Sequence, residues 1–194
     1  CVPMMSPRGE ILGALEAINH RGSELFQEPD VALLTALSAQ AAIALERDRL
    51  LKESIQKEIL ENELRLASDI QTGFLPGEVP EYENVSFAGD TRPARLVGGD
   101  YYDFVPIDEQ RVALVIADVS GKGVGAALMM AELRAVLRGR LKSLLSLEDV
   151  VGALNDVLVE DTPVGKFATL FIAVLNTDDL VLRYVNAGHD PPFL

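Results

Sequence analysis

Cysteine is almost absent from the sequence, which has Cys1 alone among its 194 residues. A single cysteine cannot form an intrachain disulfide, and this favours a reducing compartment such as the cytoplasm. Basic residues are also scarce, because 17 Lys and Arg stand against 30 Asp and Glu and leave a net charge of −13. Nucleic-acid backbones require an excess of Lys and Arg, so we expect no nucleic-acid partner.

Long apolar segments are missing as well. No apolar run reaches the roughly 18 residues that a membrane span requires, so we expect no span in this chain. The start, "CVPMMSPRGE", lacks the basic segment and the apolar run of a signal peptide, which also favours a cytoplasmic location. Because the chain opens on a cysteine and stops at "NAGHDPPFL", we expect it to be part of a longer protein.

Proline is absent between Asp30 and Phe74, and Gly73 is the only glycine in that stretch. Ala, Leu, Glu, Lys and Arg dominate the composition, and all of them are good helix formers. The pattern predicts one long helix, or two stacked helices, over residues 30–75, and Pro76 ends it.

An apolar stripe follows this predicted helix, and two pairs of its members are eleven residues apart, as in a helix of period near 3.67. One interpretation is a helix packed on its own domain. We favour the other, a two-stranded parallel coiled coil that forms a homodimer, because charged residues flank the stripe and Asn62 within it can fix the register. The stripe consists of Leu51, Ile55, Ile59, Leu66, Ile70 and Phe74.

Residues 1–30 are typical of the end of a β-rich unit, with a strand over residues 11–18. Residues 81–194 alternate strands and helices, which predicts the α+β class, with helices on an antiparallel sheet. Ser146 and Asp149 form a capping box for the second of these helices. The predicted strands are 84–91, 97–105, 111–118, 167–175 and 180–186, and the predicted helices are 124–142 and 147–160. The strand 111–118 is nearly all apolar, so we expect it to be buried on both faces.

The segment "VGGDYYDF", residues 97–104, is unusual for a strand, because glycine and aspartate are both depleted in strands. Such an exception marks a candidate functional site. If residues 97–118 form a hairpin centred on Glu109, Asp100 faces Asp118 with Cβ atoms roughly 4.5–5.5 Å apart. Two like charges in that arrangement are destabilising, so a shared proton or a bound cation must offset them.

Glycines beside both acids favour the cation. Gly98 and Gly99 precede Asp100, and Gly121 follows Asp118, so that open backbone offers carbonyl ligands and room for water, as Mg²⁺ or Mn²⁺ requires. No His or Cys is near either acid in the sequence, which disfavours zinc. The alternative is that Asp118 only caps the turn into the next helix while Asp100 is solvated at a strand edge. The stretch "GKGVG" lacks the Walker spacing, so we expect no nucleotide there.

Several motifs occur together and in the order of a known family: "IQTGFLP", "RPARLVGGDYYDF", "IADVSGKGVGAALMMAELRAVLR", "LNDVL", "FATLFIAVLN" and "YVNAGHDPPFL". Over residues 67–194 the chain resembles the SpoIIE-like branch of the bacterial PPM-type, metal-dependent serine/threonine protein phosphatases. Ahead of these motifs, "GEILGALEAIN" and "FQEPDVALLTALSAQAAIALERDRLL" resemble the last strand and the closing helix of a GAF sensor domain.

The resemblance implies a fold and a chemistry. The fold is then an α-β-β-α sandwich, present here in part. Asp100 and Asp118 are then catalytic and bind two Mn²⁺ or Mg²⁺ ions, together with the main-chain carbonyl of Val119. Lys122 and Gly121 are candidates for contact with the substrate phosphate. The implied substrate is phosphoserine or phosphothreonine on a small anti-anti-sigma, STAS-type protein, hydrolysed without a phosphoenzyme.

The resemblance also divides the chain into a GAF-like part, residues 1–45, a helical coiled-coil linker, 46–75, and the start of a phosphatase domain, 76–194. An upstream signal then acts through the linker. The family pattern continues past Leu194 into a "TDG" motif and a further aspartate, so we expect this chain alone to lack metal ligands and to be inactive. A non-catalytic dimeric scaffold that binds an anti-sigma partner remains the alternative.

Three other polar residues need an interpretation. Asp103 is three positions from Asp100 and so points to the other face of a strand, and we expect it to be structural. His189 in "NAGH" is either an acid or phosphate contact or, as we prefer, shapes a turn with Asn186. His20 is expected at the surface.

Overall fold

The computed structural model describes residues 1–19, 25–92, 96–143 and 146–193. The chain forms two compact units, Cys1–Glu61 and Asn62–Leu194. Within the described ranges, no helix combines the length and the apolar character of a membrane span. His20 lies outside the described residues, so its expected place at the surface stays a prediction.

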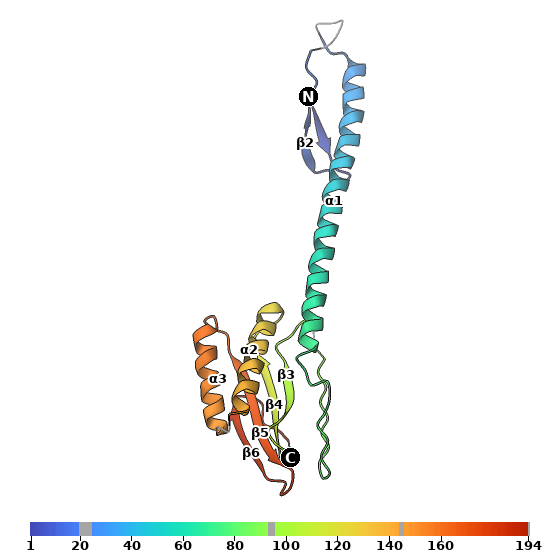
Figure 1. Ribbon diagram of the computed structural model, residues 1–194. Helices are drawn as coiled ribbons and strands as arrows, with labels where there is room; N and C mark the ends of the chain where they lie inside the picture. The colour runs from blue at the N-terminus through green and yellow to red at the C-terminus, as the bar shows by residue number, and fades with distance from the viewer. Residues whose placement is uncertain (20–24, 93–95, 144–145, 194) are drawn as a thin grey trace. The chain divides into compact units, whose positions relative to one another are not determined.

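The first unit holds two short strands and most of a long helix. β1 (Val2–Met5) runs antiparallel to β2 (Ile11–Leu15), and α1 (Glu28–Thr72) follows them (Figure 1). The Ser38 hydroxyl on α1 donates to the Pro3 carbonyl at 3.1 Å and fixes the helix to β1. β2 and α1 confirm the predicted strand and a single long helix, whereas β1 was not predicted because its four residues show no alternation.

The apolar stripe of α1 remains on the surface. Its members between residues 51 and 70 have exposed fractions of 48–62%. A helix packed along its whole length on its own domain would bury these side chains, so the exposure agrees better with the coiled-coil interpretation, although the dimer itself stays a prediction. The exposed members are Leu51, Ile55, Ile59, Leu66 and Ile70.

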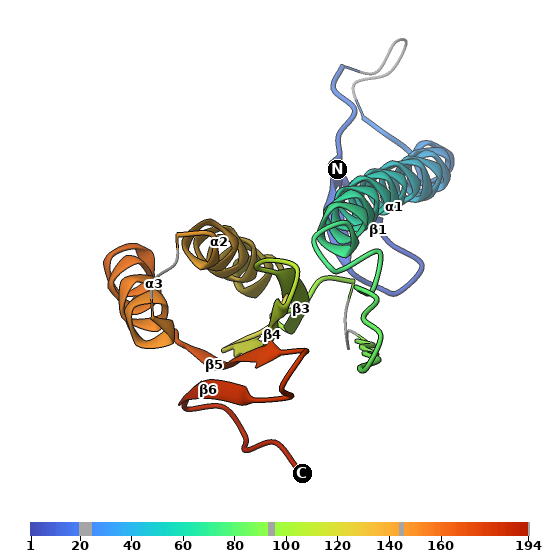
Figure 2. The same cartoon turned by 60° about the horizontal axis from the view of Figure 1, so that its bottom comes forward.

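The second unit is built on a four-stranded antiparallel sheet in the order β3-β4-β5-β6. Two helices connect β4 to β5 and lie on the same face of the sheet (Figure 2). This arrangement confirms the α+β class. The elements are β3 (Tyr101–Pro106), β4 (Arg111–Val119), α2 (Val124–Leu141), α3 (Leu147–Asp161), β5 (Ala168–Asn176) and β6 (Leu182–Ala187).

The core of this unit lies between the sheet and the two helices. Met130, Leu133 and Leu137 recur on one face of α2 and are fully buried against the sheet residues that alternate inward from β4, such as Val115 and Ala117. The predicted cap of α3 is confirmed, because the Ser146 hydroxyl accepts from the Asp149 amide at 3.1 Å.

Three expectations about the strands are wrong. Residues 97–100, predicted as the start of a strand, lie before β3, which begins at Tyr101. Residues 84–91 form no strand, because no described strand pairs with them, although their aromatic side chains still pack: Phe87 lies on Phe104, with ring centroids 5.6 Å apart. β4 is not buried on both faces, since Ile116 is 47% exposed. Within the part of the chain that the structure describes, helices cover only one face of the sheet.

An ion pair between a half-buried arginine and a buried carboxylate joins β3 to α2. Asp103 is 1% exposed, and Arg138 forks onto its two carboxylate oxygens, with Nε and Nη2 at 2.6 and 2.8 Å. The Tyr101 hydroxyl and the Phe104 amide also donate to this carboxylate. Burial, and next the hydrogen bond to Asp103, raise the pKa of Tyr101, which therefore stays a donor. The expected structural role of Asp103 agrees with these contacts.

We expect Arg138→Met to lower the free energy of unfolding by about 2–4 kcal/mol, because it leaves the Asp103 carboxylate buried without its cation. The matched control is Arg140→Met on the exposed side of the same helix, which should change stability by less than about 0.5 kcal/mol. Urea unfolding of both variants measures the difference. Equal stability of the two variants would show that the pair does not hold β3 to α2.

Candidate metal centre

The hairpin of β3 and β4 sets the geometry of the site. Its register pairs Tyr101 with Ala117, and the next step outward places Asp100 opposite Asp118, as the sequence predicted. The turn is fixed by the Asp108 carboxylate, which accepts from the Gln110 and Arg111 amides at 3.1 and 2.8 Å. The register is therefore held at the turn end of the hairpin.

The two carboxylates interact with each other. Both residues are exposed, and both line one cavity of about 620 Å³. The pKa of Asp118 is raised from its ordinary value, first by partial burial and then by the charge of Asp100 and a hydrogen bond to it. Without a cation, a shared proton is the way in which this pair relieves its repulsion.

A glycine lets the Val119 carbonyl come close to the same loop. A Cβ on Gly99 would lie 2.5 Å from the Val119 carbonyl oxygen, which no side chain can tolerate. Gly99 is therefore required for this close approach of the two backbones. The carbonyl that was predicted as a ligand thus lies against the loop that carries Asp100.

The loop before Asp100 is held by the last turn of α1, a contact that sequence reasoning missed. Gln71 donates its amide to the Gly98 carbonyl at 2.6 Å and accepts from the Gly98 amide at 3.0 Å. One side chain thus satisfies both backbone groups of Gly98, as a neighbouring strand would. The motif "IQTGFLP" contained this residue, but a surface glutamine on a helix carries no sequence signal of such a contact.

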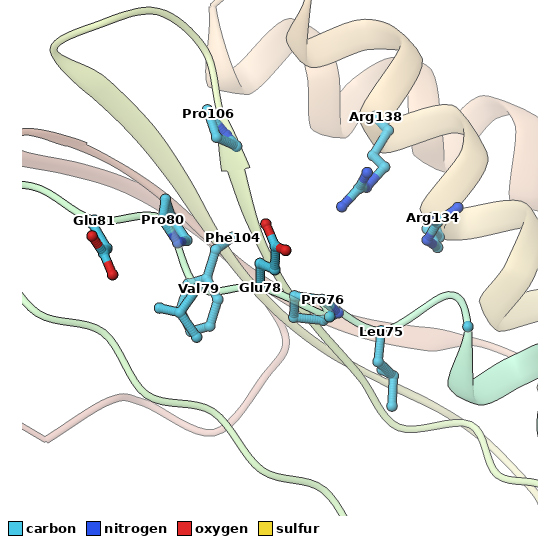
Figure 3. Close-up of a pocket in the computed structure, with 12 residues that line it drawn as sticks. Leu75, Pro76, Glu78, Val79, Pro80, Glu81, Phe104, Pro106, Arg134 and Arg138 are labelled. Carbon is cyan, nitrogen blue, oxygen red and sulfur yellow. The ribbon is translucent and has the colours of Figure 1, made fainter.

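The end of α1 is also fixed to α2. Arg134 donates through Nε to the Phe74 carbonyl at 2.7 Å, and its guanidinium stands 5.1 Å from the centre of the Phe74 ring. Figure 3 shows Arg134 and Arg138 projecting from α2 beside the segment that follows α1, where a second cavity of about 950 Å³ lies. The residues just before β3 are therefore tied to the end of α1, which is itself tied to α2.

The donor atoms fit a hard divalent cation. Two carboxylates and one main-chain carbonyl are all oxygen ligands, which Mg²⁺ and Mn²⁺ prefer. Asp100, Asp118 and the Val119 carbonyl would hold such an ion, and its charge would replace the shared proton. Among the described residues, no group of three or more His, Cys, Asp or Glu side chains is placed to hold a metal.

Two expectations about neighbouring residues change. His189 lines the same cavity as both acids. The expectation that no histidine is near them holds along the sequence but is wrong for the folded chain, because β6 brings His189 to the cavity from a distant part of the sequence. Lys122 and Gly121 follow β4 but do not line this cavity. Gly121 has φ +101°, and the ammonium of Lys166 lies 2.6 Å from where its Cβ would be. Contact of Lys122 or Gly121 with substrate stays a prediction.

We expect metal-free Asp118→Asn to be more stable than the wild type near neutral pH, because the amide removes the repulsion with Asp100. The folded state raises the pKa of Asp118, so the wild type loses stability as the pH rises through that folded-state pKa. The stability difference between Asp118→Asn and the wild type should therefore shrink as the pH falls toward 3.8, the ordinary pKa of an aspartate. Thermal unfolding in EDTA measures it, with the exposed Asp156→Asn on α3 as the control. A variant less stable than the wild type near neutral pH contradicts the carboxylate pair.

The family models match two parts of the chain. Residues 108–194 match the family described as stage II sporulation protein E (SpoIIE), and residues 1–45 match the GAF domain. The SiaA-PP2C domain of Pseudomonas aeruginosa has the same fold, with a TM-score of 0.54 and 19% identity over 68% of this chain and 54% of that chain.

Two curated proteins are similar in sequence. Phosphoserine phosphatase RsbU of Bacillus subtilis is 34% identical over 139 residues, which cover 72% of this chain and 41% of RsbU. Protein IcfG of Synechocystis sp. is 30% identical over 172 residues, which cover 75% of this chain and 27% of IcfG. The chain thus spans less than half of the length of either relative. Together with the sheet and its two helices, these matches place residues 108–194 in the SpoIIE family with a PP2C-like fold, and residues 1–45 in the GAF family.

Proposed function

We propose that this chain belongs to a divalent-metal-dependent phosphatase that hydrolyses phosphoserine or phosphothreonine on a regulatory protein of the anti-anti-sigma, STAS type. The observation that carries the proposal is the facing pair of Asp100 and Asp118, whose repulsion requires a cation or a proton. The similarity to a protein named phosphoserine phosphatase supports the reaction class.

The residues around the two acids have separate roles in the proposed site. Asp100, Asp118 and the Val119 carbonyl hold Mn²⁺ or Mg²⁺, and these ions, when bound, supply charge neutralisation of the phosphoryl group and an activated water. Gly99 gives the backbone room to place the carbonyl there. Gln71 holds the loop that carries Asp100 in position. Because such a site acts through charges aimed at the phosphoryl group, small displacements of this loop are expected to lower the rate of hydrolysis.

We expect the full-length protein to release phosphate from a phosphoserine-containing peptide only when Mn²⁺ or Mg²⁺ is present. Asp118→Asn and Asp100→Asn should each lower the rate at least about 100-fold, because each removes a charged ligand. Asp156→Asn, an exposed aspartate on α3, should keep the wild-type rate. A malachite-green assay for free phosphate measures this. Equal rates for wild type and Asp118→Asn reject the metal-dependent reaction, and no release by any of them favours the scaffold alternative.

Regulation through α1 is part of the same proposal. α1 is one continuous helix from the GAF part to the residues that hold the loop of Asp100, and after Pro29 in its first turn it has no glycine or proline that would let it bend freely. An upstream signal that changes the pairing of two α1 helices would therefore act on Gln71 and Phe74 and, through them, on the site. The 1–45, 46–75 and 76–194 division of the chain belongs to this proposal.

We expect α1 to form the interface of a homodimer along its exposed apolar stripe. Ile55→Asp with Ile59→Asp should produce monomers, because four charges would then meet at the centre of the pair. Lys57→Asp with Glu61→Asp is the matched control: it changes the net charge by the same amount on the opposite face of α1 and should leave the dimer intact. Light scattering of the full-length protein gives the mass. An unchanged mass for the isoleucine variant argues against the coiled coil.

A further inference from the structure

The turn after β6 does not explain why residue 189 is a histidine. Asn186 makes the turn, since its amide donates to the His189 carbonyl at 3.0 Å and its oxygen accepts from the His189 amide at 2.9 Å. Any residue at position 189 would supply these backbone groups. The imidazole is therefore left without a role in the turn, and the preferred turn-shaping interpretation accounts only for Asn186.

The imidazole is fixed by a residue that pairs with Asp118. Nδ1 of His189 lies 2.9 Å from the Thr169 hydroxyl, and β5 places Thr169 opposite Asp118 in the sheet. The direction of this hydrogen bond depends on the tautomer of the ring, and in the doubly protonated imidazole Nδ1 donates to the Thr169 hydroxyl. A histidine whose Nδ1 is held in this way has a set ring orientation and presents Nε2 for other contacts.

His189 lines the same cavity as Asp100 and Asp118. It is also close enough to Asp118 for its charge to lower the pKa of that carboxyl, against the raising effects of burial and Asp100. The half-buried ring thus lies beside the carboxylate pair without being grouped with it as a metal ligand. A phosphate ester in the cavity would meet the acids and the imidazole together.

We propose that His189 is the proton donor to the leaving serine or threonine oxygen, an inference that rests on the proposed phosphatase function. Water oxygen bonds to phosphorus, the bond from phosphorus to the ester oxygen breaks, and that oxygen keeps the electron pair. The doubly protonated imidazole gives its Nε2 proton to this oxygen, which leaves as a hydroxyl. The imidazole then takes a proton from solvent, and the proton of the attacking water passes to solvent. An alkoxide is a poor leaving group, so the donor matters for this ester.

The test varies how much the leaving group needs a proton. In the full-length protein with Mn²⁺, His189→Gln keeps a hydrogen-bonding side chain but has no proton to give. It should lower kcat on a phosphoserine-containing peptide about 100-fold or more, while kcat on p-nitrophenyl phosphate, whose leaving group is stable as an anion, should fall less than about threefold. Calorimetric Mn²⁺ affinity should stay within about threefold of wild type, since His189 is not a ligand.

Thr169 supplies a matched pair of variants. Thr169→Val removes the hydroxyl that holds Nδ1 and keeps the side-chain shape, whereas Thr169→Ser keeps the hydroxyl. Thr169→Val should lower kcat about tenfold, again only on the phosphoserine peptide. Thr169→Ser should keep the wild-type kcat on both substrates. A merely structural role would lower the rates on both substrates alike.

Each outcome decides the question. Equal loss on both substrates, or no loss on either, overturns the proton-donor role of His189 while leaving the phosphatase function in place. A large loss of Mn²⁺ affinity in His189→Gln also overturns it, because the ring would then act on the metal. A wild-type protein that is inactive on both substrates overturns the proposed function, and the inference falls with it.

Discussion

β3 and β4 pair so that the residue before β3 and the residue near the end of β4 face each other, and this brings Asp100 to Asp118. Strand pairing would normally exclude two like charges at such a position. The pair persists because the backbone around it is determined elsewhere: the Asp108 turn fixes one end of the hairpin, and Gln71 holds Gly98 at the other. The repulsion is therefore relieved by a proton or a cation and not by movement of the strands.

The packing beneath the hairpin makes this constraint rigid. The buried Asp103 ties β3 to Arg138 on α2, and the apolar face of α2 covers β4. α1 ends against the same helix through Arg134 and Phe74. The groups that position the acids also receive the end of α1, so the proposed metal binding and the proposed regulation would use one set of contacts. A cation site built in this way is preorganised, and small changes in these contacts are expected to change its affinity.

The sequence was sufficient for the features that depend on local order. The register of Asp100 and Asp118 followed from a polar turn at their midpoint, and the Ser146 cap followed from its spacing. Contacts between distant segments were not predictable. Gln71 and His189 reach the site only because the fold brings them there, and no local pattern separates them from surface polar residues. Residues 84–91 had a strand-like composition but no partner strand, and composition cannot supply one.

The central claim is that the facing acids form a cation site, and calorimetric titration of Mn²⁺ into the full-length protein tests it most directly. The account predicts binding by the wild type that weakens at least about tenfold in Asp100→Asn and in Asp118→Asn, because each loses a charged oxygen ligand. Asp156→Asn should bind like the wild type. Unchanged Mn²⁺ affinity in both site variants would contradict the account.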